Sequence, residues 1–485
     1  MDQMIIVEVA YILLLLFTFY RIIYDTERTA KVYAYLMLVL MVPVLGIIFY
    51  FSFGVNYRNR KMFERKSIGN QKLEEVMSED LHAHTEGLID RYLGENNDTR
   101  KMARLLLNDR LSPLTHGNTV DVLINGEDKY QRLRDDLKAA KDHIHMEYYI
   151  WKDDVIGNEL KDILIQKAQE GVTVRVIYDD FGSRGIKGRM EKELKQAGAD
   201  VFPFYSIKFY LLASRINYRN HRKIAIIDGK VAYTGGINIS EEYVNDRGFE
   251  QGYWRDTHLR IEGPGVAYLQ YLFFSDWNFS AEEALPFESH FFPDDLGSAK
   301  TDRDVMVQIA ASGPDSERPT ILYSLMKAIE SADEELLITT PYFVPTRAML
   351  DGLIMAALGG VDVKILLPEK SDSRMVDLVG RSYFKQLLKA GVKIYLYTKG
   401  MIHAKTMVVD GQLSIVGTAN LDIRSFDLNF EVNAIVYDEN VSDDLRKAFQ
   451  NDLEDSMLID CDRWCDRSVF KEMVERIARL LSPIM

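Results

Sequence analysis

The chain has 485 residues, of which 47% are hydrophobic and 27% are charged, a composition typical of a globular protein of about two or three domains. Its 59 Lys and Arg against 73 Asp and Glu give a formal charge of −14, which excludes a basic nucleic-acid-binding protein at the whole-chain level. The two cysteines, Cys461 and Cys465, are too few to staple a chain of this length, and no second Cys or His pair lies beside them to complete a zinc site.

Two long apolar runs, Met4 to Tyr20 and Val32 to Phe53, lie near the N-terminus. The second run crosses a hydrocarbon core easily, and the first just reaches if Asp2 and Arg21 lie in the head-group layers. We therefore expect two transmembrane helices within residues 1–56 and a multi-pass protein of the cell membrane. A cleaved signal peptide is excluded because the first run lacks a basic leading segment and a small-residue cleavage site. The basic residues beside the runs predict a cytoplasmic catalytic portion and attract anionic lipids. These residues are Arg21, Arg28, Lys31, Arg58, Arg60, Lys61, Arg65 and Lys66.

Residues 57–118 are polar and helix-prone, which predicts a helical connector. After them, short apolar runs alternate with helical stretches, the pattern of an α/β protein. The order of these segments then repeats, as in QAGADVFPF and KAGVKIYLY, or NHRKIAIIDGKVAYTGGIN and IHAKTMVVDGQLSIVGTAN. We therefore expect two homologous α/β domains, 119–290 and 291–485, that share one active site.

Each half carries His-x-Lys, four further residues, and Asp-Gly. The intervening residues are β-formers and Asp-Gly is a strong hairpin signal, so His and Lys are predicted on one face of one strand. Two chance matches at corresponding places in a duplicated chain are much less plausible than a functional pair. The first copy is His221, Lys223 and Asp228, and the second is His403, Lys405 and Asp410. The two aspartates occupy turns, where a structural role is favoured over a catalytic one.

The return strand of each hairpin ends in Gly and Asn. We expect backbone amides at Gly236 and Thr418, and the side chains of Asn238 and Asn420, to bind the oxygens of a phosphate. The histidines need carboxylates to fix their tautomers, and Asp256 and Glu431 follow the first and second motifs in strand-like runs that could lie beside the motif strands.

Two sets of His, Lys and Asn suit a phosphodiester. Lysine and asparagine neutralise its non-bridging oxygens, one histidine attacks phosphorus, and the other protonates the leaving alkoxide. An imidazole with a pKa near 6.5 serves as acid or base at neutral pH.

The paired motifs resemble those of the phospholipase D superfamily. The two apolar runs, the RNYRNHRK approach, the YWRDTHLRIEGPGV run and the IARLLSPIM ending resemble bacterial cardiolipin synthases in particular. The resemblance implies a phosphatidyltransferase that needs no metal, nucleotide or other cofactor and takes phosphatidylglycerol as donor and acceptor. It implies a phosphatidyl-histidine intermediate, with His221 favoured as nucleophile and His403 as acid and base, although sequence symmetry does not choose between them.

Two other functions stay open. A hydrolase, either a phospholipase or a nuclease, differs in whether water reaches the intermediate, and the nuclease fits poorly with the acidic charge and the anchor. A lipid-binding scaffold without catalysis is disfavoured because both motifs are intact. The insertion 207–218 could rest on the bilayer or pack as a helix. The C-terminal segment VFKEMVERIARLLSPIM has helical apolar spacing, and docking on the core is favoured over membrane contact.

Overall fold

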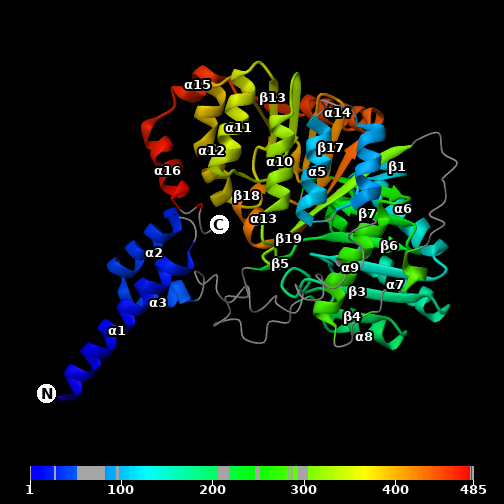
Figure 1. Ribbon diagram of the computed structural model, residues 1–485, viewed down its shortest axis with the longest axis horizontal. Helices are drawn as coiled ribbons and strands as arrows, with labels where there is room; N and C mark the ends of the chain where they lie inside the picture. Colours follow the sequence, from blue (N-terminus) through cyan, green and yellow to red (C-terminus); the bar gives the residue numbers. More distant parts are fainter. Residues whose placement is uncertain are drawn as a thin grey trace.

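The computed structural model describes residues 2–26, 29–51, 82–93, 98–110, 112–204, 218–245, 252–281, 285, 288–292, 304–480 and 482. These residues form a small N-terminal group of helices and a much larger α/β part (Figure 1). Apart from Tyr218, the insertion 207–218 lies outside the described residues.

One N-terminal helix, α1 (Asp2–Asp25), is long and apolar enough to cross a membrane. Its apolar span has 22 residues, which at 1.5 Å per residue gives about 33 Å, slightly more than a hydrocarbon core. The second apolar run divides into α2 (Thr29–Met41) and α3 (Pro43–Phe49), and neither helix is long enough to span. The expectation of two transmembrane helices is therefore wrong for the part of the chain that the structure describes.

The break between α2 and α3 has a local cause. Val42 precedes a proline and leaves the helical conformation, with φ −135° and ψ 71°. The chain then folds back so closely that a side chain at Gly46 would lie 2.7 Å from the Cα of Val39. Tyr35 and Tyr50 close the resulting hairpin, with ring centroids 5.4 Å apart. Hydropathy alone does not detect this reversal, because every residue around it is apolar.

The α/β part contains a similar series of elements twice, with β12 and α13 added in the second half. In the first half they are β1 (Thr115–Ile124), α6 (Asn125–Ala139), β2 (His143–Tyr148), α7 (Val155–Gln169), β3 (Thr173–Tyr178), α8 (Arg189–Gln196), β4 (Asp200–Pro203), β5 (Arg219–Asn220), β6 (Lys223–Ile227), β7 (Val231–Gly235), β8 (Tyr253–Arg255), β9 (Thr257–Glu262) and α9 (Val266–Ser280). In the second half they are β10 (Val305–Ser312), α10 (Thr320–Glu330), β11 (Glu335–Thr339), β12 (Phe343–Val344), α11 (Arg347–Leu358), β13 (Asp362–Pro368), α12 (Arg374–Lys389), β14 (Lys393–Tyr397), β15 (Gly400–Ile402), β16 (Thr406–Val409), β17 (Leu413–Gly417), β18 (Leu421–Asp422), α13 (Ile423–Asp427), β19 (Asn429–Tyr437) and α14 (Glu439–Glu454). The α/β fold predicted from the alternating pattern is confirmed.

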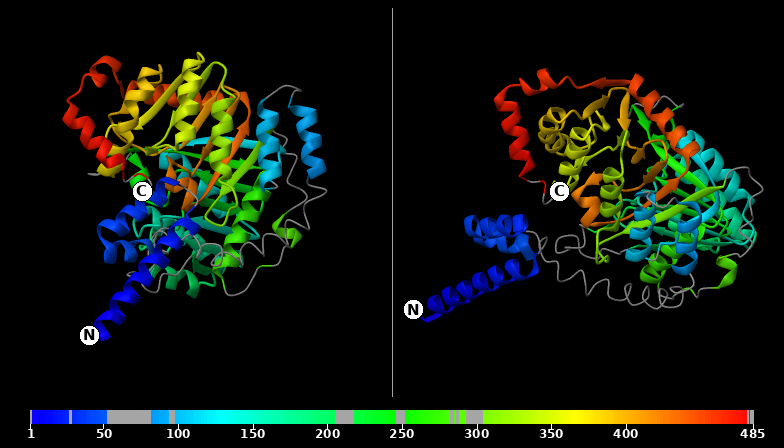
Figure 2. Two further views of the ribbon diagram at one scale, coloured as in Figure 1. Left: turned by 60° about the vertical axis from the view of Figure 1, so that its left-hand side comes forward. Right: turned by 45° about the horizontal axis from the view of Figure 1, so that its top comes forward.

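The two halves share one continuous sheet, whose path runs β20-β14-β13-β11-β16-β17-β19-β10-β1-β9-β7-β6-β2-β3-β4. Its centre is the antiparallel pair β1–β10, in which Thr115 lies opposite Val307 and Asn118 opposite Val305. Strands β2, β3 and β4 of the first half and β11, β13 and β14 of the second are parallel and connected by helices. The edge strand β20 and the motif hairpins β6–β7 and β16–β17 are antiparallel. Figure 2 shows the helices on both faces of this sheet.

Three hydrophobic clusters fill the α/β part. One belongs to the first half and a second to the latter half, while the third combines side chains from both, such as Ile224 and Leu259 with Val307, Val416 and Val432. This shared cluster lies under the central strands, so the two motif hairpins are held on one rigid support.

The predicted connector packs on the second half. Residues 82–92 are helical and α5 (Asp98–Arg110) follows them; Ile89, Met102 and Leu106 are buried in the second-half core. Gln308 Nε2 donates to the carbonyl of Ala103 at 3.1 Å, which ties α5 to β10.

The chain ends in β20 (Ser456–Leu458), α15 (Cys461–Cys465) and α16 (Val469–Arg479), and α16 lies beside α12. This last helix docks on the core, as predicted, but its large apolar side chains face outward. Its buried residues are Glu475 and Ala478, whereas Val469, Phe470 and Ile477 are exposed.

Candidate active site

Each motif begins at the start of a hairpin strand. Lys223 opens β6 and Lys405 directly precedes β16, with the histidine two residues before each lysine. Extended backbone points residues i and i+2 to the same side, as the spacing predicted. Both histidines and both lysines are buried.

A reciprocal exchange of short strands brings the halves together around the histidines. The strand β5, which precedes His221, pairs in parallel with the start of β19, and the N–H of His221 donates to the carbonyl of Phe430 at 2.9 Å. The strand β15, which precedes His403, pairs in parallel with β8, and the N–H of His403 donates to the carbonyl of Arg255 at 2.6 Å. Each motif histidine is thus bonded to the residue just before a carboxylate of the opposite half.

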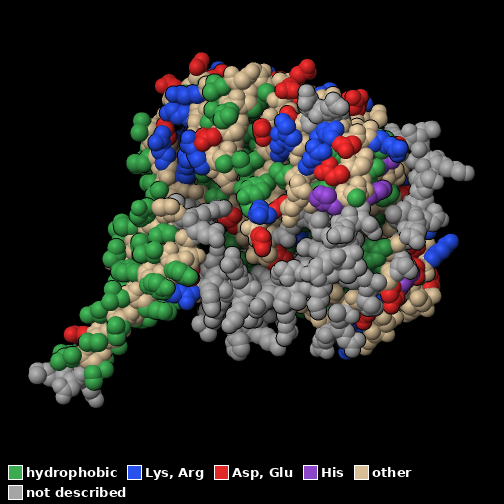
Figure 3. Space-filling view, viewed as in Figure 1, with side chains coloured by type: hydrophobic (Ala, Val, Ile, Leu, Met, Phe, Trp, Pro, Cys, Tyr) green, Lys and Arg blue, Asp and Glu red, His purple; other side chains and the backbone are tan. Residues whose placement is uncertain are grey.

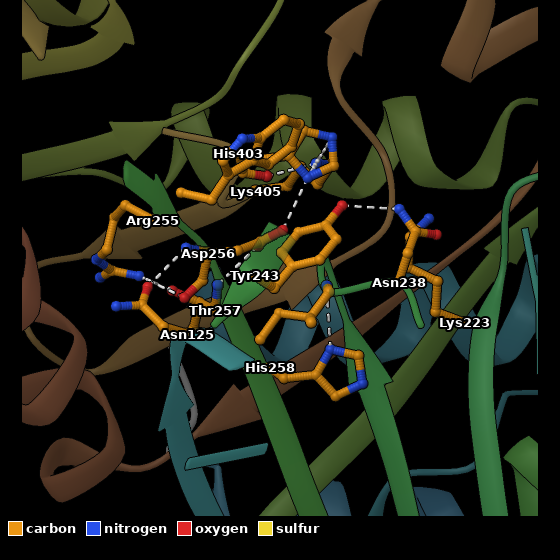
Figure 4. A network of polar contacts seen from close by, with 12 residues as sticks. Asn125, Lys223, Asn238, Tyr243, Arg255, Asp256, Thr257, His258, His403 and Lys405 are labelled. Carbon is orange, nitrogen blue, oxygen red and sulfur yellow. Dashed lines mark hydrogen bonds and ion pairs between the residues drawn. The ribbon is translucent and has the colours of Figure 1, made fainter. Parts of the chain in front are cut away.

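Each histidine consequently meets the carboxylate of the other half. His221 Nδ1 lies 2.9 Å from Glu431 Oε2. His403 Nδ1 lies 2.7 Å from Asp256 Oδ2, the pair drawn in Figure 4. The sequence predicted that each carboxylate would lie beside the motif strand of its own half. Because β5 pairs with β19 and β15 pairs with β8, each carboxylate instead contacts the histidine of the other half. With a carboxylate accepting from Nδ1, the lone pair of each imidazole is left on Nε2.

Aromatic rings flank both imidazoles. Tyr149 meets His221 edge-on at a centroid distance of 4.7 Å. Trp254 and Tyr243 lie 5.6 and 6.0 Å from the His403 ring. These rings fix the imidazole planes and reduce the access of water to them.

The motif lysines occupy equivalent places. Lys223 Nζ donates to the carbonyl of His221 at 2.9 Å, and Lys405 Nζ donates to the carbonyl of His403. Lys405 Nζ also lies 3.1 Å from His403 Nε2. Burial lowers the pKa of Lys223 to about 7 and that of Lys405 to about 8, since an ammonium loses its hydration there.

The same burial keeps the imidazoles neutral. Burial, followed by the positive charge of Lys223, holds the pKa of His221 well below its usual value. Burial and the charge of Lys405 lower the pKa of His403 to about 4, against the opposing effect of Asp256. Burial raises the pKa of Glu431 to about 7, and nearby Lys223 and Thr418 act in the opposite direction. The charges of Lys223 and Lys405 both lower the pKa of His221. The two motifs therefore share one electrostatic environment.

The two asparagines differ in their contacts. Asn238 Nδ2 donates to the Tyr243 hydroxyl at 2.8 Å, and its Oδ1 accepts from the N–H of Ile150 at 3.2 Å. Asn420 is buried, and its Oδ1 has no hydrogen-bond partner among the described residues.

Gly236 and Thr418 do not present backbone amides to a ligand as expected. The N–H of Gly236 donates to the carbonyl of Thr257, and the N–H of Thr418 donates to the carbonyl of Val432, both at 2.9 Å. Gly236 instead makes room for a carboxylate, because a side chain there would lie 2.0 Å from Asp256 Oδ1. The hydroxyl of Thr418 donates to Glu431 Oε2 at 2.5 Å. Both residues therefore support the carboxylates instead of contacting phosphate through their amides.

The motif aspartates lie at the distant ends of the hairpins. Asp228 and Asp410 adopt positive φ values of 53° and 49° in the turns. Asp228 accepts from the N–H groups of residues 141–143, and Asp410 from those of residues 333–335. They clamp each turn to the start of the neighbouring strand, the structural role that their turn position favoured.

Comparisons with known proteins agree with this geometry. The family described as "Cardiolipin synthase, PLD-like domain" matches residues 133–255 and 325–453, one match in each half. The chain is 43% identical over 469 residues to the "Major cardiolipin synthase ClsA" of Bacillus subtilis, covering 96% of both chains. It is 39% identical to a cardiolipin synthase of Listeria innocua, covering 98% of both. The chain belongs to the cardiolipin synthase family.

The fold is also found outside the cardiolipin synthases. The crystal structure of a phosphatidylserine synthase from Haemophilus influenzae matches with a TM-score of 0.59 and 15% identity, covering 79% of this chain and 98% of that one. At this identity the likeness concerns the fold alone. The resemblance to the phospholipase D superfamily and the predicted duplication are confirmed by the paired family matches.

This cardiolipin synthase has supporting residues that sequence reasoning missed. Asn429 Nδ2 donates to Glu431 Oε1 at 3.0 Å. The fully buried Lys129 donates to the carbonyl of Ile237 at 2.9 Å, and Tyr130 donates to that of Asn238 at 2.6 Å. Lys129 and Tyr130 are more than one hundred residues from their partners in the sequence, so no local sequence pattern predicts these contacts. Within the described ranges, no group of three or more His, Cys, Asp or Glu could hold a metal ion.

Proposed function

We propose that this cardiolipin synthase transfers a phosphatidyl group from one phosphatidylglycerol to a second, releasing glycerol and forming cardiolipin. The observation that carries the proposal is the crossed arrangement of the two histidines, each oriented by a carboxylate of the opposite half. Two imidazoles whose Nε2 atoms face the reaction supply the nucleophile and the acid and base that a two-step phosphodiester exchange requires.

In the first step, His221 Nε2 attacks the phosphorus of the donor lipid. The P–N bond forms as the P–O bond to glycerol breaks. The bound anionic phosphodiester favours the imidazolium form of His403, which gives its Nε2 proton to the departing alkoxide. Lys223 and Lys405 stabilise the charge that gathers on the non-bridging oxygens. Asn238 and Asn420 stay proposed as further donors to the phosphate.

In the second step, a terminal hydroxyl of the acceptor phosphatidylglycerol loses its proton to His403 Nε2, and its oxygen attacks phosphorus. The P–N bond breaks and His221 is regenerated. One phosphodiester replaces another, so the exchange is close to isoenergetic. The carboxylates of Glu431 and Asp256 keep the Nδ1 atoms of His221 and His403 protonated, which leaves Nε2 for both steps.

Product analysis tests the reaction. The purified protein in detergent is incubated with labelled phosphatidylglycerol, and the lipid and water-soluble products are separated. Cardiolipin with an equal amount of glycerol is the expected result. Phosphatidic acid as the main product would identify a phospholipase, and no turnover would identify a lipid-binding scaffold.

A donor lipid with a nitrophenolate leaving group tests the roles of the histidines, because this group departs without receiving a proton. The variant His403→Ala should release one equivalent of nitrophenolate per enzyme in a rapid burst and then stop. His221→Ala should show no burst. The reverse pattern would assign the nucleophile to His403.

The membrane orientation follows from charge. The apolar helix α1 provides one anchor, and Arg21, Arg28 and Lys31 follow its apolar centre, whereas Asp2 precedes it. Positive residues stay on the cytoplasmic side, so we place the α/β part in the cytoplasm. Protease added to intact spheroplasts should leave the α/β part uncut and should cut it after the cells are broken.

A further inference from the structure

The C-terminal helix α16 is packed in the reverse of the usual amphipathic manner. Surface helices of soluble proteins turn an apolar stripe to the core and polar residues to water. In α16 the side that contacts the core buries Glu475 and the small Ala478, and the large apolar side chains are exposed. The exposed side chains and their accessible fractions are Val469 81%, Phe470 68%, Met473 48% and Ile477 57%, followed by Leu480 76% at the C-cap.

Specific contacts hold α16 in this orientation. Arg467, just before the helix, forms two hydrogen bonds to Glu475, at 2.8 and 3.0 Å. Lys385 of α12 donates to Glu472 at 2.9 Å, and the Arg479 guanidinium lies 4.2 Å from the centroid of the Tyr383 ring. A rotation of α16 that buried its apolar stripe would break all three contacts. The outward stripe is therefore a property of the packed helix.

The exposed residues form one continuous stripe. At 100° per residue, positions 469, 470, 473, 477 and 480 fall within about a third of the helix circumference. Arg476 lies at one edge of the stripe and is partnered by Glu472. An exposed apolar stripe with a basic residue at its edge suits a helix that lies in the interface of a bilayer.

We propose that α16 is a second membrane contact, lying parallel to the bilayer with this stripe among the acyl chains. The helix α1 holds the chain at a membrane, and all views place α16 on the same side of the α/β part as α1 and α2 (Figures 1 and 2). The space-filling view shows apolar side chains along the edge where α16 lies, with basic side chains next to them (Figure 3). This inference does not depend on which reaction the histidines catalyse.

A second copy of the chain fits this stripe less well than a bilayer does. The helix has 11 residues, so the stripe is about 16 Å long and on the order of 200 Å² in area. A standard protein interface buries roughly 800 Å² on each partner. The bilayer has no such requirement, because each apolar side chain inserts independently.

Site-specific fluorescence on the full-length protein tests the proposal. Cys461 and Cys465 are changed to serine, and an environment-sensitive fluorophore is attached to Ile477→Cys. The matched control is Val155→Cys, at a position that is 53% exposed and begins α7. In Figure 1 the helix α7 lies on the side of the α/β part opposite to α16. The protein is reconstituted into vesicles of phosphatidylcholine and phosphatidylserine, in which no phosphatidylglycerol is turned over.

We expect a blue shift for the label at position 477 and quenching by lipids that carry a spin label on the acyl chain, with neither effect at position 155. Equal, water-like emission at both positions would overturn the proposal. A blue shift that depends on protein concentration and is insensitive to spin-labelled lipid would also overturn it, because a second copy would then cover the stripe.

A variant that introduces negative charges into the stripe provides an independent readout. Phe470→Glu combined with Ile477→Glu should lower turnover on vesicles by about tenfold, because charged groups replace side chains buried in the interface. Turnover in detergent micelles should stay unchanged, which separates this effect from a damaged active site. Equal activity of the variant and the parent protein on vesicles would contradict a functional membrane contact. Inactivity of the parent protein in both assays would count against the proposed reaction alone, since the fluorescence result is independent of turnover.

Discussion

At the scale of single residues, the two histidine–carboxylate pairs are similar in geometry and different in surroundings. Glu431 receives donors from Thr418 and Asn429 in addition to His221, so its carboxylate is fully held. Asp256 bonds His403 and the N–H of Thr257. Burial lowers the pKa of both histidines, so both imidazoles are neutral before substrate binds.

The buried lysines predict a pH dependence. An ammonium loses its positive charge above its pKa, and burial lowers the pKa to about 7 for Lys223 and about 8 for Lys405. We therefore expect kcat/KM to fall as pH rises through this range, since kcat/KM reports the free enzyme. A bound phosphodiester favours the charged lysines, so kcat should fall at higher pH than kcat/KM.

The variant Lys223→Arg checks the origin of this decline, because arginine stays charged throughout the range. Its activity is expected to be lower, but the fall of kcat/KM should move to higher pH. Steady-state kinetics in mixed micelles across the pH range measures both profiles. A kcat/KM that rises between pH 7 and pH 8 in the parent protein would refute the assignment.

The crossed carboxylates predict losses in kcat. Glu431→Gln removes the anion that fixes the Nδ1–H tautomer of His221, and Asp256→Asn does the same to His403. Each should lower kcat by about 10²- to 10⁴-fold and change KM little, by comparison with the corresponding change in a Ser-His-Asp triad. Kinetics with a parallel thermal melt separates this effect from unfolding. A variant with normal kcat would show that the carboxylate has no orienting role.

At the scale of elements, the hairpin turns carry a stability prediction. The hairpin strand β6 has five residues, so Asp228 lies about 17 Å from Lys223 along the strand. Asp228→Ala leaves backbone N–H groups without their acceptor and should lower the free energy of unfolding by about 1–3 kcal/mol. Asp228→Asn keeps an acceptor oxygen and a residue type that tolerates positive φ, so its loss should be smaller.

Chemical denaturation with an activity assay on the folded fraction measures both variants. Activity per folded molecule should stay within a few-fold of the parent, because the turn does not contact the site. A large loss of kcat in a fully folded Asp228→Ala protein would instead show that Asp228 has a catalytic role.

The hairpins also show what the sequence could predict at this scale. His-x-Lys, β-formers and Asp-Gly are local signals, and they predicted both strands and both turns. The partners of the histidines depend on β5 and β8, which have two and three residues and carry no pairing signal of their own. Tertiary packing decides how these short strands pair. The sequence therefore could not show which carboxylate contacts which histidine. The break at Pro43 did have a local signal, which the uniform hydropathy around it concealed.

At the scale of the whole molecule, the halves depend on one another in two ways. Each histidine is completed by the opposite half, and the β1–β10 pair with its shared core joins the halves into one sheet. An isolated half would expose the apolar side chains of that shared core and would lack a carboxylate partner for its histidine. The α/β part should therefore behave as one cooperative unit despite its internal duplication.

A pair of matched core variants tests this cooperativity. Leu160 in the first half and Leu387 in the second are both fully buried, each in the separate core of its own half. Leu160→Ala and Leu387→Ala should each lower the free energy of unfolding by about 2–5 kcal/mol through the cavity left behind. Calorimetry in detergent should show a single transition of the α/β part that either variant moves to lower temperature. If each variant moved a different transition and left the other in place, the shared sheet would not couple the halves, and an active site built across them would lose its structural support.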